Sequence, residues 1–464
     1  MSRRWFGTDG IRGVANVDLT VELAVAAGRA AAEVLGARGN GGGSSGARLL
    51  VGRDTRRSGR LLEAALAAGI ASGGGDAHLA GVIPTPGVSR VAALDGYDGG
   101  VVISASHNPW RDNGIKFFGS DGKKLLDAVE IEIERHMRAT LAGDDDSVAA
   151  SADGGGEAEE ETTVGSIEDD PSAVPRYVDD LLATLAPEVG GLRVLLDCAH
   201  GAMYQVAPFA FRAAGANVDA VCTQPDGRNI NAGCGSTDLR VVSGRVAQGD
   251  YDLGLAFDGD GDRVLAVDAD GTTVDGDQVL AILADWLRAQ GRLANDTVVV
   301  TSMSNLGFHR AMRERGIAVE VTDVGDRYVL ERMEQVGAVL GGEQSGHVLY
   351  LTGGATGDGL MTGLLLCHVV RESGRSLADL GAIMTRFPQV LVNVRVADKG
   401  RLAQAEEVWR SVRIEEEALG DEGRIVLRPS GTESLVRVMV EAPTRERCEE
   451  IAQRLAVTVG RTLA

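Results

Sequence analysis

Lysine is almost absent from this sequence of 464 residues, and arginine supplies nearly all of its basic side chains. The formal net charge is -21, which excludes a nucleic-acid-binding surface, because such a surface needs a basic footprint. A single phosphate group needs only a local cluster of cations and is compatible with this charge. The few lysines are therefore candidates for special roles: Lys116, Lys123, Lys124 and Lys399.

Long hydrophobic runs are also missing, although apolar residues make up 44% of the chain. No segment is apolar for long enough to span a bilayer, and the first residues, MSRRWFGTDG, lack the apolar core of a signal peptide. The five cysteines are scattered without CxxC spacing, which favours a reducing compartment and predicts neither a disulfide framework nor a zinc site. We therefore expect a cytoplasmic protein that binds no membrane. The sequence leaves the oligomeric state open, a homodimer included.

Several common nucleotide-binding and catalytic motifs do not occur. There is no GxxxxGK(S/T), which excludes a P-loop NTPase, and no GxSxG, which makes a serine hydrolase a poor fit. Residues 41–46 (GGGSSG) fit GxGxxG, but they follow a predicted helix and precede a predicted strand, the reverse of a dinucleotide site.

A pattern of helix, strand, helix, strand occurs three times along the chain, within residues 21–83, 174–221 and 276–323. It predicts three tandem α/β domains with mixed, mainly parallel sheets. After Phe387 the pattern changes, which predicts a smaller C-terminal α+β domain. The predicted boundaries are 1–143, 173–275, 276–387 and 388–464. The segment 144–172 is acidic and rich in Gly, Ser and Ala, so we expect a flexible insertion or linker.

The stretch GLAFDGDGDRVLAV places Asp258, Asp260 and Asp262 directly after an apolar strand. Carboxylates this close repel one another unless a cation lies among them, and the intervening glycines let the backbone bend to bring them together. An EF-hand is excluded, because Arg263 and Ala269 stand where that loop needs glycine and glutamate. Hard oxygen ligands favour Mg²⁺ acting with a phosphate oxygen, and Arg263 would cap such a site. The alternative is a solvated turn between two strands.

The stretch RPSGTESLVRVMVEA, from Arg428 to Ala442, predicts a phosphate-binding loop between two strands. Backbone N–H groups, hydroxyls and guanidinium groups can surround an anion. An ordinary hairpin turn is the alternative and is about equally probable for the loop in isolation. The candidate residues are Arg428, Ser430, Gly431, Thr432 and Arg437.

The stretch GGEQSGHVLY places Glu343, Ser345 and His347 at alternate positions, so their side chains can project toward one ligand. A carboxylate, a hydroxyl and an imidazole suit a sugar, and histidine can move protons near neutral pH. The alternative is a salt bridge between Glu343 and His347 within the loop.

Two arginine-bearing loops could add cations to an anion site. The first, FGTDGIRG, contains Thr8 and Arg12. For the second, GRDTRRSG with Arg53 and Arg56, we expect surface exposure instead.

The stretch VVISASHNPWRDNGIKFF sets Ser106 after a buried strand, with Lys116 further on. His107 is a poor base for Ser106, because it is the adjacent residue. A serine near a metal loop, phosphate-binding arginines and a sugar loop favours a phosphorylated nucleophile. Lys116 would neutralise the phosphoryl group and help to move the proton.

Together these loops resemble the α-D-phosphohexomutase superfamily, and within it the branch that acts on glucosamine phosphates. SASHNP, DGDGDR, GEQSGH and RPSGTE stand in the superfamily's order and spacing, and FGTDGIRG, NINAGCGSTD and VGDRYV also match. The likeness covers the chain except for the acidic segment from about 144 to 170. Gln344 favours the glucosamine branch over phosphomannomutase/phosphoglucomutase.

The resemblance implies four domains around a central cleft, each contributing one loop. Ser106 would be a phosphoserine and, through its phosphate, would bind Mg²⁺ together with the three aspartates. Lys116 and His347 would be the acid and base, and Glu343 and Ser345 would contact sugar hydroxyls. The residues from Arg428 to Arg437 named above would hold the non-reacting phosphate, with Thr8, Arg12 and Arg263 as further substrate contacts.

The implied reaction transfers the phosphoryl group from Ser106 to a hexose 6-phosphate, which gives a sugar 1,6-bisphosphate that turns over and returns its other phosphate. The expected function is the interconversion of glucosamine 6-phosphate and glucosamine 1-phosphate. Alternatives are a mutase for mannose or glucose phosphates, a phosphatase and a non-enzymatic sensor. Two residues depart from the superfamily: Asp323 stands near the position of a lysine, and Ser434 replaces a proline.

Overall fold

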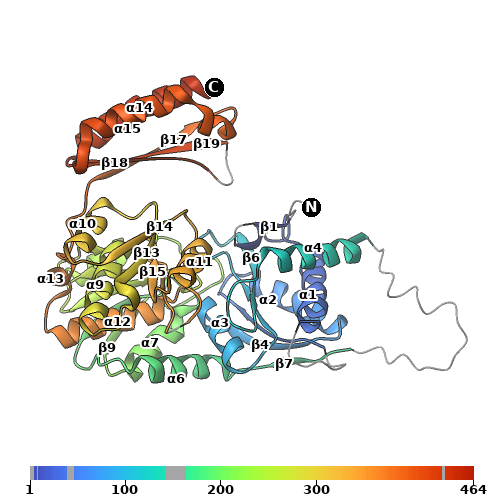
Figure 1. The fold of residues 1–464 in the computed structure, drawn as a ribbon. Coiled ribbons are helices and arrows are strands. Elements are labelled where there is room, and N and C mark those ends of the chain that lie inside the picture. Colours follow the sequence, from blue (N-terminus) through green and yellow to red (C-terminus); the bar gives the residue numbers. More distant parts are fainter. Residues whose placement is uncertain (1–4, 8, 39–45, 143–163, 353, 431–433) are drawn as a thin grey trace, which may run out of the picture.

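Four β-sheets follow one another along the chain and divide it into four units, which we call domains I to IV (Figure 1). The computed structural model describes residues 5–7, 9–38, 46–142, 164–352, 354–430 and 434–464. Domains I to III each combine a mixed sheet with helices, and domain IV has a small antiparallel sheet. The prediction of three α/β domains followed by a smaller α+β domain is therefore confirmed.

Domain I contains the largest sheet. Its elements are β1 (Phe6–Gly7), β2 (Gly10–Val14), α1 (Val21–Gly36), β3 (Arg48–Arg53), α2 (Gly59–Ser72), β4 (Asp76–Val82), α3 (Thr85–Leu94), β5 (Gly99–Ile103), β6 (Asp112–Gly119), α4 (Asp127–Ala142) and β7 (Ile167–Asp169). The strand order is β1-β2-β6-β5-β3-β4-β7, in which β5, β3, β4 and β7 run parallel. β5 is buried along its whole length, as expected for a strand covered on both faces. Helices α1, α2 and α4 share one apolar cluster, whereas α3 belongs to another.

The predicted insertion, 144–172, is only partly within the described residues. Its residues 143–163 lie outside them. β7, however, pairs in parallel with β4 through Ala77 and Ile167, and it forms the edge of the domain I sheet. The prediction of an irregular segment up to residue 172 is therefore wrong for its last part. The acidic composition concealed a strand of three residues, which is too short to show a period.

Domains II and III contain smaller mixed sheets. Domain II comprises α6 (Ala173–Leu185), β8 (Arg193–Asp197), α7 (Met203–Ala213), β9 (Asn217–Val221), α8 (Arg240–Val246), β10 (Leu253–Phe257), β11 (Val264–Asp268) and β12 (Thr273–Val274). Domain III comprises α9 (Gly276–Ala289), η1 (Ala294–Asp296), β13 (Thr297–Thr301), α10 (Leu306–Glu314), β14 (Ala318–Thr322), α11 (Asp326–Val336), β15 (Leu340–Gly342), β16 (Val348–Tyr350), α12 (Gly359–Ser373) and α13 (Leu377–Gly381). The strand orders are β12-β11-β10-β8-β9 and β14-β13-β15-β16.

One apolar core runs through domains I, II and III. Val88 of α3, Tyr177 of α6 and Leu364 of α12 all belong to it. Helix α12 is apolar on nearly all sides, which is typical of a helix enclosed by protein. A Cβ on its Gly363 would lie 2.9 Å from Leu255 Cδ1, so domain II packs closely against this helix of domain III. The first three domains are thus held together by shared burial.

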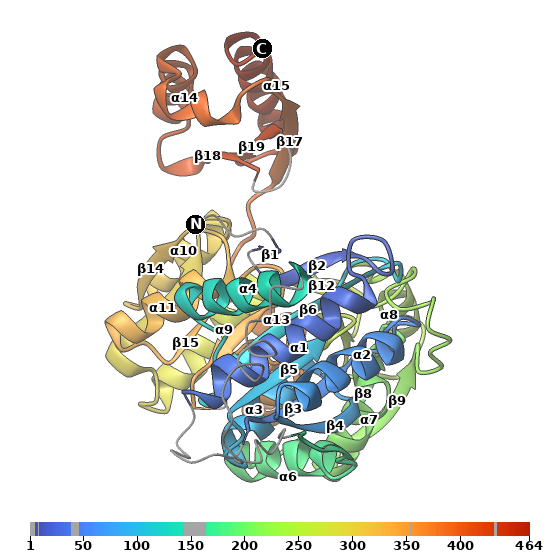
Figure 2. The same cartoon turned by 90° about the vertical axis from the view of Figure 1, so that its right-hand side faces the viewer.

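Domain IV has a core of its own. Its elements are β17 (Gln389–Arg395), η2 (Lys399–Gln404), α14 (Glu406–Leu419), η3 (Gly420–Glu422), β18 (Arg424–Pro429), β19 (Leu435–Glu441) and α15 (Arg445–Thr462). The antiparallel sheet β17-β19-β18 packs against both α-helices in a separate cluster (Figures 1 and 2). In both views this domain stands apart from the other three. Within the described part of the chain, none of the helices combines the length and apolar composition that crossing a membrane requires.

Domains III and IV meet in a network of buried polar groups. Asp277 accepts a hydrogen bond from the backbone N–H of Asn305 at 2.7 Å, and the Asn305 side chain donates to Glu441 of β19 at 3.1 Å. Burial raises the pKa of Asp277 to about 7, and the nearby Asp275 adds to this rise. Burial also raises the pKa of Glu441. Two carboxyl groups at this junction therefore favour the protonated form more than free carboxyl groups do.

We expect the Asp277→Asn variant to lose part of the pH dependence of stability. The folded-state pKa lies above that of a free aspartate, so Asp277 stabilises the wild type at low pH, and this contribution fades as pH rises toward about 7. The stability of Asp277→Asn relative to wild type should therefore increase between about pH 4 and 7, by at most about 4 kcal/mol. Urea unfolding at several pH values measures it. Asp270→Asn, at an exposed position, is the control, and equal slopes for Asp277→Asn and wild type would contradict the assignment.

Candidate active site

Ser106 lies in the loop that follows β5, and the protein holds it in an uncommon conformation. Its φ is 49°, in the left-handed region that non-glycine residues rarely adopt. The backbone N–H of Ser106 donates to Ser104 Oγ at 2.9 Å, and the residue is 1% exposed. Its Oγ donates to Asp258 Oδ2 at 2.5 Å. His107 Nδ1 is 3.3 Å from the same Oγ, so the closer Asp258 carboxylate is the acceptor of the hydroxyl's hydrogen bond.

Arg56 binds the backbone of the Ser106 loop. The expectation that Arg56 is exposed is wrong. Arg56 is 1% exposed and forms an ion pair with Asp54 at 2.8 Å. Its guanidinium also donates to four backbone carbonyl oxygens, those of Ser106, Asn108, Pro109 and Asp112. A run of arginines in a sequence predicts an exposed segment. A guanidinium can nevertheless be buried when it forms an ion pair and all its N–H groups donate hydrogen bonds. Arg53 is part-buried and pairs with Glu63 at 2.9 Å.

The three aspartates of the DGDGDR loop lie together at the end of β10. One carboxylate oxygen of each lies within 4.8 Å of the others, and all three residues are buried, which excludes a solvated turn. Oδ1 of Asp260 and Oδ1 of Asp262 have no hydrogen-bond partner among the described residues. Burial, followed by the charges of Asp262 and Asp260, raises the pKa of Asp258. Unpaired buried oxygens that repel one another fit a hard divalent cation such as Mg²⁺.

Lys116 is the cation that lies closest to this cluster. It sits on β6, opposite Val102 of β5, and is 2% exposed. Its Nζ lies 3.0 Å from Asp260, 3.2 Å from Asp9 and 3.8 Å from Asp262. Burial alone would lower the pKa of Lys116, but these carboxylates outweigh burial and raise it. Lys116 is therefore held as an ammonium group.

His347 and Glu343 lie in the turn between β15 and β16 and have different partners. His347 is 3.6 Å from Asp262 and 3.5 Å from Asp326, so the predicted alternative of a Glu343–His347 bridge does not describe its surroundings. Burial lowers the pKa of His347, but its hydrogen bond to Asp262 and the charge of that carboxylate produce a net rise. Glu343 accepts hydrogen bonds from Ser345 Oγ and from the N–H of Gly325, both at 3.1 Å.

Lys124, Asp9 and Asp326, to which the sequence assigned no role in the site, lie beside Lys116 and His347. Lys124 lies between Asp9 and Asp326, at 2.5 Å and 2.6 Å. Burial would lower the pKa of Lys124, but Asp326 and Asp9 raise it. Arg12 pairs with Oδ2 of Asp9, the same oxygen that Lys116 contacts, whereas Lys124 pairs with Oδ1. The available signal was the scarcity of lysine, which marked Lys124, and the VGDRYV motif, which contains Asp326.

Several of these side chains line a cleft of about 450 Å³ between domains I, II and III, whereas Ser106 and Lys116 are buried behind its lining. Its walls include Arg12, His107, Arg263, Glu343 and His347. Burial would lower the pKa of Arg263, but Asp262 and Asp258 raise it, so its charge is secure. Thr8, also predicted for this site, lies outside the described residues. The cleft thus has cations on several walls and carboxylates at its base.

The predicted phosphate loop belongs to domain IV, and its described residues do not line this cleft. Arg428 and Arg437 face each other across β18 and β19. The Nε atoms of both are buried and have no partner among the described residues. Burial and then the charge of Arg437 lower the pKa of Arg428, whereas Glu343 counteracts this effect. Two adjacent, part-buried cations with unused donors suit an anion. Ser430 is buried beside them, and Gly431 and Thr432 fall outside the described residues.

The sequence matches the phosphoglucomutase/phosphomannomutase family in four consecutive pieces. Its alpha/beta/alpha domain I matches residues 3–143, domain II residues 175–271, domain III residues 275–387 and its C-terminal domain residues 391–457.

Curated relatives are similar along their whole length. A phosphoglucosamine mutase of Saccharopolyspora erythraea is 52% identical and covers 98% of this chain and 99% of its own. One of Rhodococcus jostii is 50% identical, covering 98% and 99%.

Solved structures share the fold. A phosphoglucomutase/phosphomannomutase family protein of Burkholderia thailandensis superposes with a TM-score of 0.80 at 24% identity, covering 99% of this chain and 97% of its own. An N-acetylphosphoglucosamine mutase of Aspergillus fumigatus, in complex with GlcNAc-6P and magnesium, gives 0.70 at 18% identity, covering 100% and 96%.

We expect Arg56→Lys to destabilise the protein although it keeps the charge. A lysine cannot reach all the acceptors of the guanidinium, so buried carbonyl oxygens lose their donors, at a cost of about 3 kcal/mol. Chemical unfolding measures the loss. Arg57→Lys, at the exposed neighbouring position, is the matched control and should change stability by less than about 0.5 kcal/mol. Equal stabilities of the two variants would show that Arg56 does not hold the loop.

Proposed function

The chain belongs to the phosphoglucomutase/phosphomannomutase family, and we propose that it interconverts glucosamine 6-phosphate and glucosamine 1-phosphate through a phosphoserine at Ser106. The branch rests on relatives that are phosphoglucosamine mutases at 52% and 50% identity over almost the whole chain. Gln344, the residue that favours this branch in the sequence, donates weakly to Asp275 at 3.4 Å and does not line the cleft. It supports the sugar loop and does not itself select the sugar.

The position of Ser106 Oγ carries this proposal. The oxygen lies 2.5 Å from one of three clustered carboxylates, and the adjacent residue, His107, lines the cleft that contains several cations. A hydrolase would need a base for water at this place, whereas a phosphoserine needs a cation among the carboxylates and positive charge around its phosphate. The unpaired oxygens of Asp260 and Asp262 and the ammonium group of Lys116 supply these conditions.

In the first step, the C1 hydroxyl of a hexose 6-phosphate attacks the phosphorus of phosphoserine. The bond from phosphorus to Ser106 Oγ breaks, Oγ leaves with the electron pair, and a sugar 1,6-bisphosphate forms. His347, which Asp262 and Asp326 flank, receives the hydroxyl proton. Lys116 stays charged and compensates the negative charge that develops on Oγ. Mg²⁺, held by Asp258, Asp260 and Asp262, would add Lewis-acid stabilisation of the transferring phosphoryl oxygens.

In the second step, the bisphosphate turns over, and Ser106 Oγ attacks the phosphorus of its 6-phosphate. The bond from phosphorus to the C6 oxygen breaks, and this oxygen leaves with the electron pair, takes the proton from His347 and becomes the 6-hydroxyl of the sugar 1-phosphate. Glu343 and Ser345 orient the sugar hydroxyls, and Arg12 and Arg263 add positive charge along the path. Arg428, Ser430 and Arg437 hold the phosphate that does not react, together with Gly431 and Thr432. Because domain IV has its own core, it can move toward the cleft as a unit when this phosphate binds. A trace of sugar 1,6-bisphosphate would phosphorylate Ser106 and so activate the protein.

Phosphorus NMR tests the reaction and its substrate. Purified protein with Mg²⁺ and a trace of bisphosphate should form a 1-phosphate signal fastest from glucosamine 6-phosphate, compared with glucose and mannose 6-phosphates in separate tubes. Ser106→Ala should lower turnover by at least about 1,000-fold while the fold persists, because the group that carries the phosphoryl is gone. Faster formation of the 1-phosphate from mannose or glucose 6-phosphate would assign the protein to the phosphomannomutase/phosphoglucomutase branch. Release of inorganic phosphate alone, or a fully active Ser106→Ala variant, would reject the mutase.

Arg428→Lys tests the phosphate grip on domain IV. A lysine cannot make the two parallel hydrogen bonds of a guanidinium, so kcat/KM should fall by about 10- to 100-fold, mainly through KM. Steady-state kinetics with glucosamine 6-phosphate measures the change. Arg395→Lys, at an exposed position on strand β17 of the same sheet, serves as the control and should behave as wild type. An unchanged KM for Arg428→Lys would place the phosphate elsewhere.

A further inference from the structure

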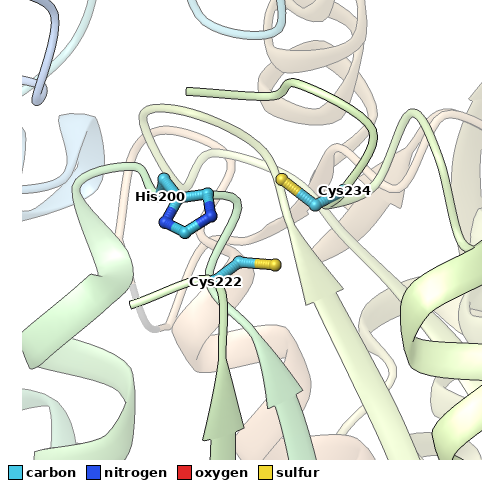
Figure 3. A group of neighbouring side chains, drawn as sticks. All are labelled: His200, Cys222 and Cys234. Atoms are coloured by element: carbon cyan, nitrogen blue, oxygen red, sulfur yellow. The ribbon is translucent and has the colours of Figure 1, made fainter. Parts of the chain in front are cut away.

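A second group of metal-ligand side chains lies in domain II, apart from the aspartate cluster. It consists of His200, Cys222 and Cys234, and its ligand atoms all lie within 4.8 Å of one another. Figure 3 shows both sulfur atoms and one nitrogen of the imidazole turned toward a common centre. The sequence predicted no zinc site, because these residues are far apart in the chain and lack CxxC spacing. The fold brings them together at one edge of a sheet.

The backbone sets this arrangement in place before any ligand binds. β8 and β9 are adjacent parallel strands, so their carboxyl ends, which lead to His200 and Cys222, meet at the same edge. The N–H of His200 donates to the carbonyl of Cys222 at 2.7 Å. The third loop is tied to the first, since the carboxylate of Asp197 accepts from the N–H of both Ala199 and Gly235. Cys234 precedes Gly235, so all three ligand loops are connected.

The chemistry of the group selects a soft cation. Two thiols and an imidazole are the ligands that Zn²⁺ and similar d¹⁰ ions prefer, whereas Mg²⁺ prefers oxygen. The two sulfur atoms lie within 4.8 Å of each other, and the negative charge of the buried Asp197 acts on Cys222. A divalent cation would replace the two thiol protons and leave the group electrically neutral, with the charge of Asp197 behind it. His200 and Cys222 are part-exposed, which leaves one coordination position for water.

Coordination also requires one local change. Nδ1 of His200 accepts a long hydrogen bond, 3.2 Å, from the N–H of Gln224. If Nε2 binds the cation, the remaining imidazole proton lies on Nδ1, and this contact must open. Gln224 is exposed in a loop beyond the ends of the strands, so its backbone can turn away.

We propose that His200, Cys222 and Cys234 bind one Zn²⁺ ion, which braces the loops that support Ser106. Two contacts link the site to the Ser106 loop. The carbonyl of His200 accepts from Thr55 Oγ1 at 2.5 Å, next to the buried Arg56. Asn231, in the same loop as Cys234, donates to the carbonyl oxygens of Ser106 at 2.9 Å and of Asn108 at 3.3 Å. The ion would fasten domain II loops that hold the reactive loop of domain I.

Cobalt substitution in the full-length protein tests the proposal independently of activity. Reduced, metal-free protein is titrated with Co²⁺ in excess Mg²⁺, which keeps the aspartates occupied. A thiolate-to-cobalt charge-transfer band should saturate at one equivalent and disappear when Zn²⁺ is added, because carboxylate ligands give no such band. Cys222→Ser and Cys234→Ala should lose the band and bind Zn²⁺ at least about 100-fold more weakly. Asp258→Asn and Cys448→Ala, a buried cysteine of domain IV, should keep the band.

A thermal measurement covers the case in which Cys234→Ala does not fold. Zn²⁺ should raise the Tm of wild type and leave that of Cys222→Ser, changed at a part-exposed residue, unaffected. No charge-transfer band in wild type, or equal Zn²⁺ affinity in wild type and Cys222→Ser, overturns the proposal. It is also overturned if reduced protein binds no Zn²⁺ and the two cysteines instead form a disulfide on mild oxidation.

Discussion

The mutual repulsion of three buried carboxylates is the constraint on which the site depends. Asp258, Asp260 and Asp262 are held close together where little water can screen them, so each needs compensating positive charge. Lys116 comes from domain I, Arg263 from the aspartate loop itself and His347 from domain III. These cationic groups come from separate parts of the chain. The need to compensate the charge of one short loop therefore constrains the relative positions of domains I, II and III.

The same alternation of charge continues away from the metal loop. Asp9 contacts Lys116 and Lys124, and Lys124 contacts Asp326 at the start of α11. The row therefore links the turn between β1 and β2, strand β6 and the segment after it in domain I with α11 of domain III through ion pairs. Domain IV takes no part in this row and has its own core, which leaves it attached mainly through Asn305 and Glu441. Ion pairs and a shared apolar core thus connect the three domains that line the cleft, whereas domain IV has a separate core.

The sequence was sufficient for features that depend on neighbours in the chain. The repeat of helices and strands gave the four domains, and short motifs located Ser106, the aspartates and His347. It failed where a residue's surroundings come from remote segments. Arg56 looked exposed because its carbonyl partners follow β5, and Cys222 and Cys234 looked unrelated because only the sheet brings them to His200. Asp9 lies within the FGTDGIRG motif but received no role of its own, since an aspartate beside glycines is common in turns.

The hydrogen bond between Ser106 and Asp258 connects phosphorylation with metal binding. In the unmodified protein the serine hydroxyl donates a hydrogen bond of 2.5 Å to the carboxylate, so the contact is attractive. If Ser106 is phosphorylated, as we propose, Oγ has no proton, and a phosphate of about two negative charges faces the aspartates. The contact then becomes repulsive unless a cation lies between the two groups. Phosphorylation of Ser106 and binding of Mg²⁺ therefore favour each other, and Mg²⁺ should bind more tightly to the phosphorylated protein than to the unmodified one.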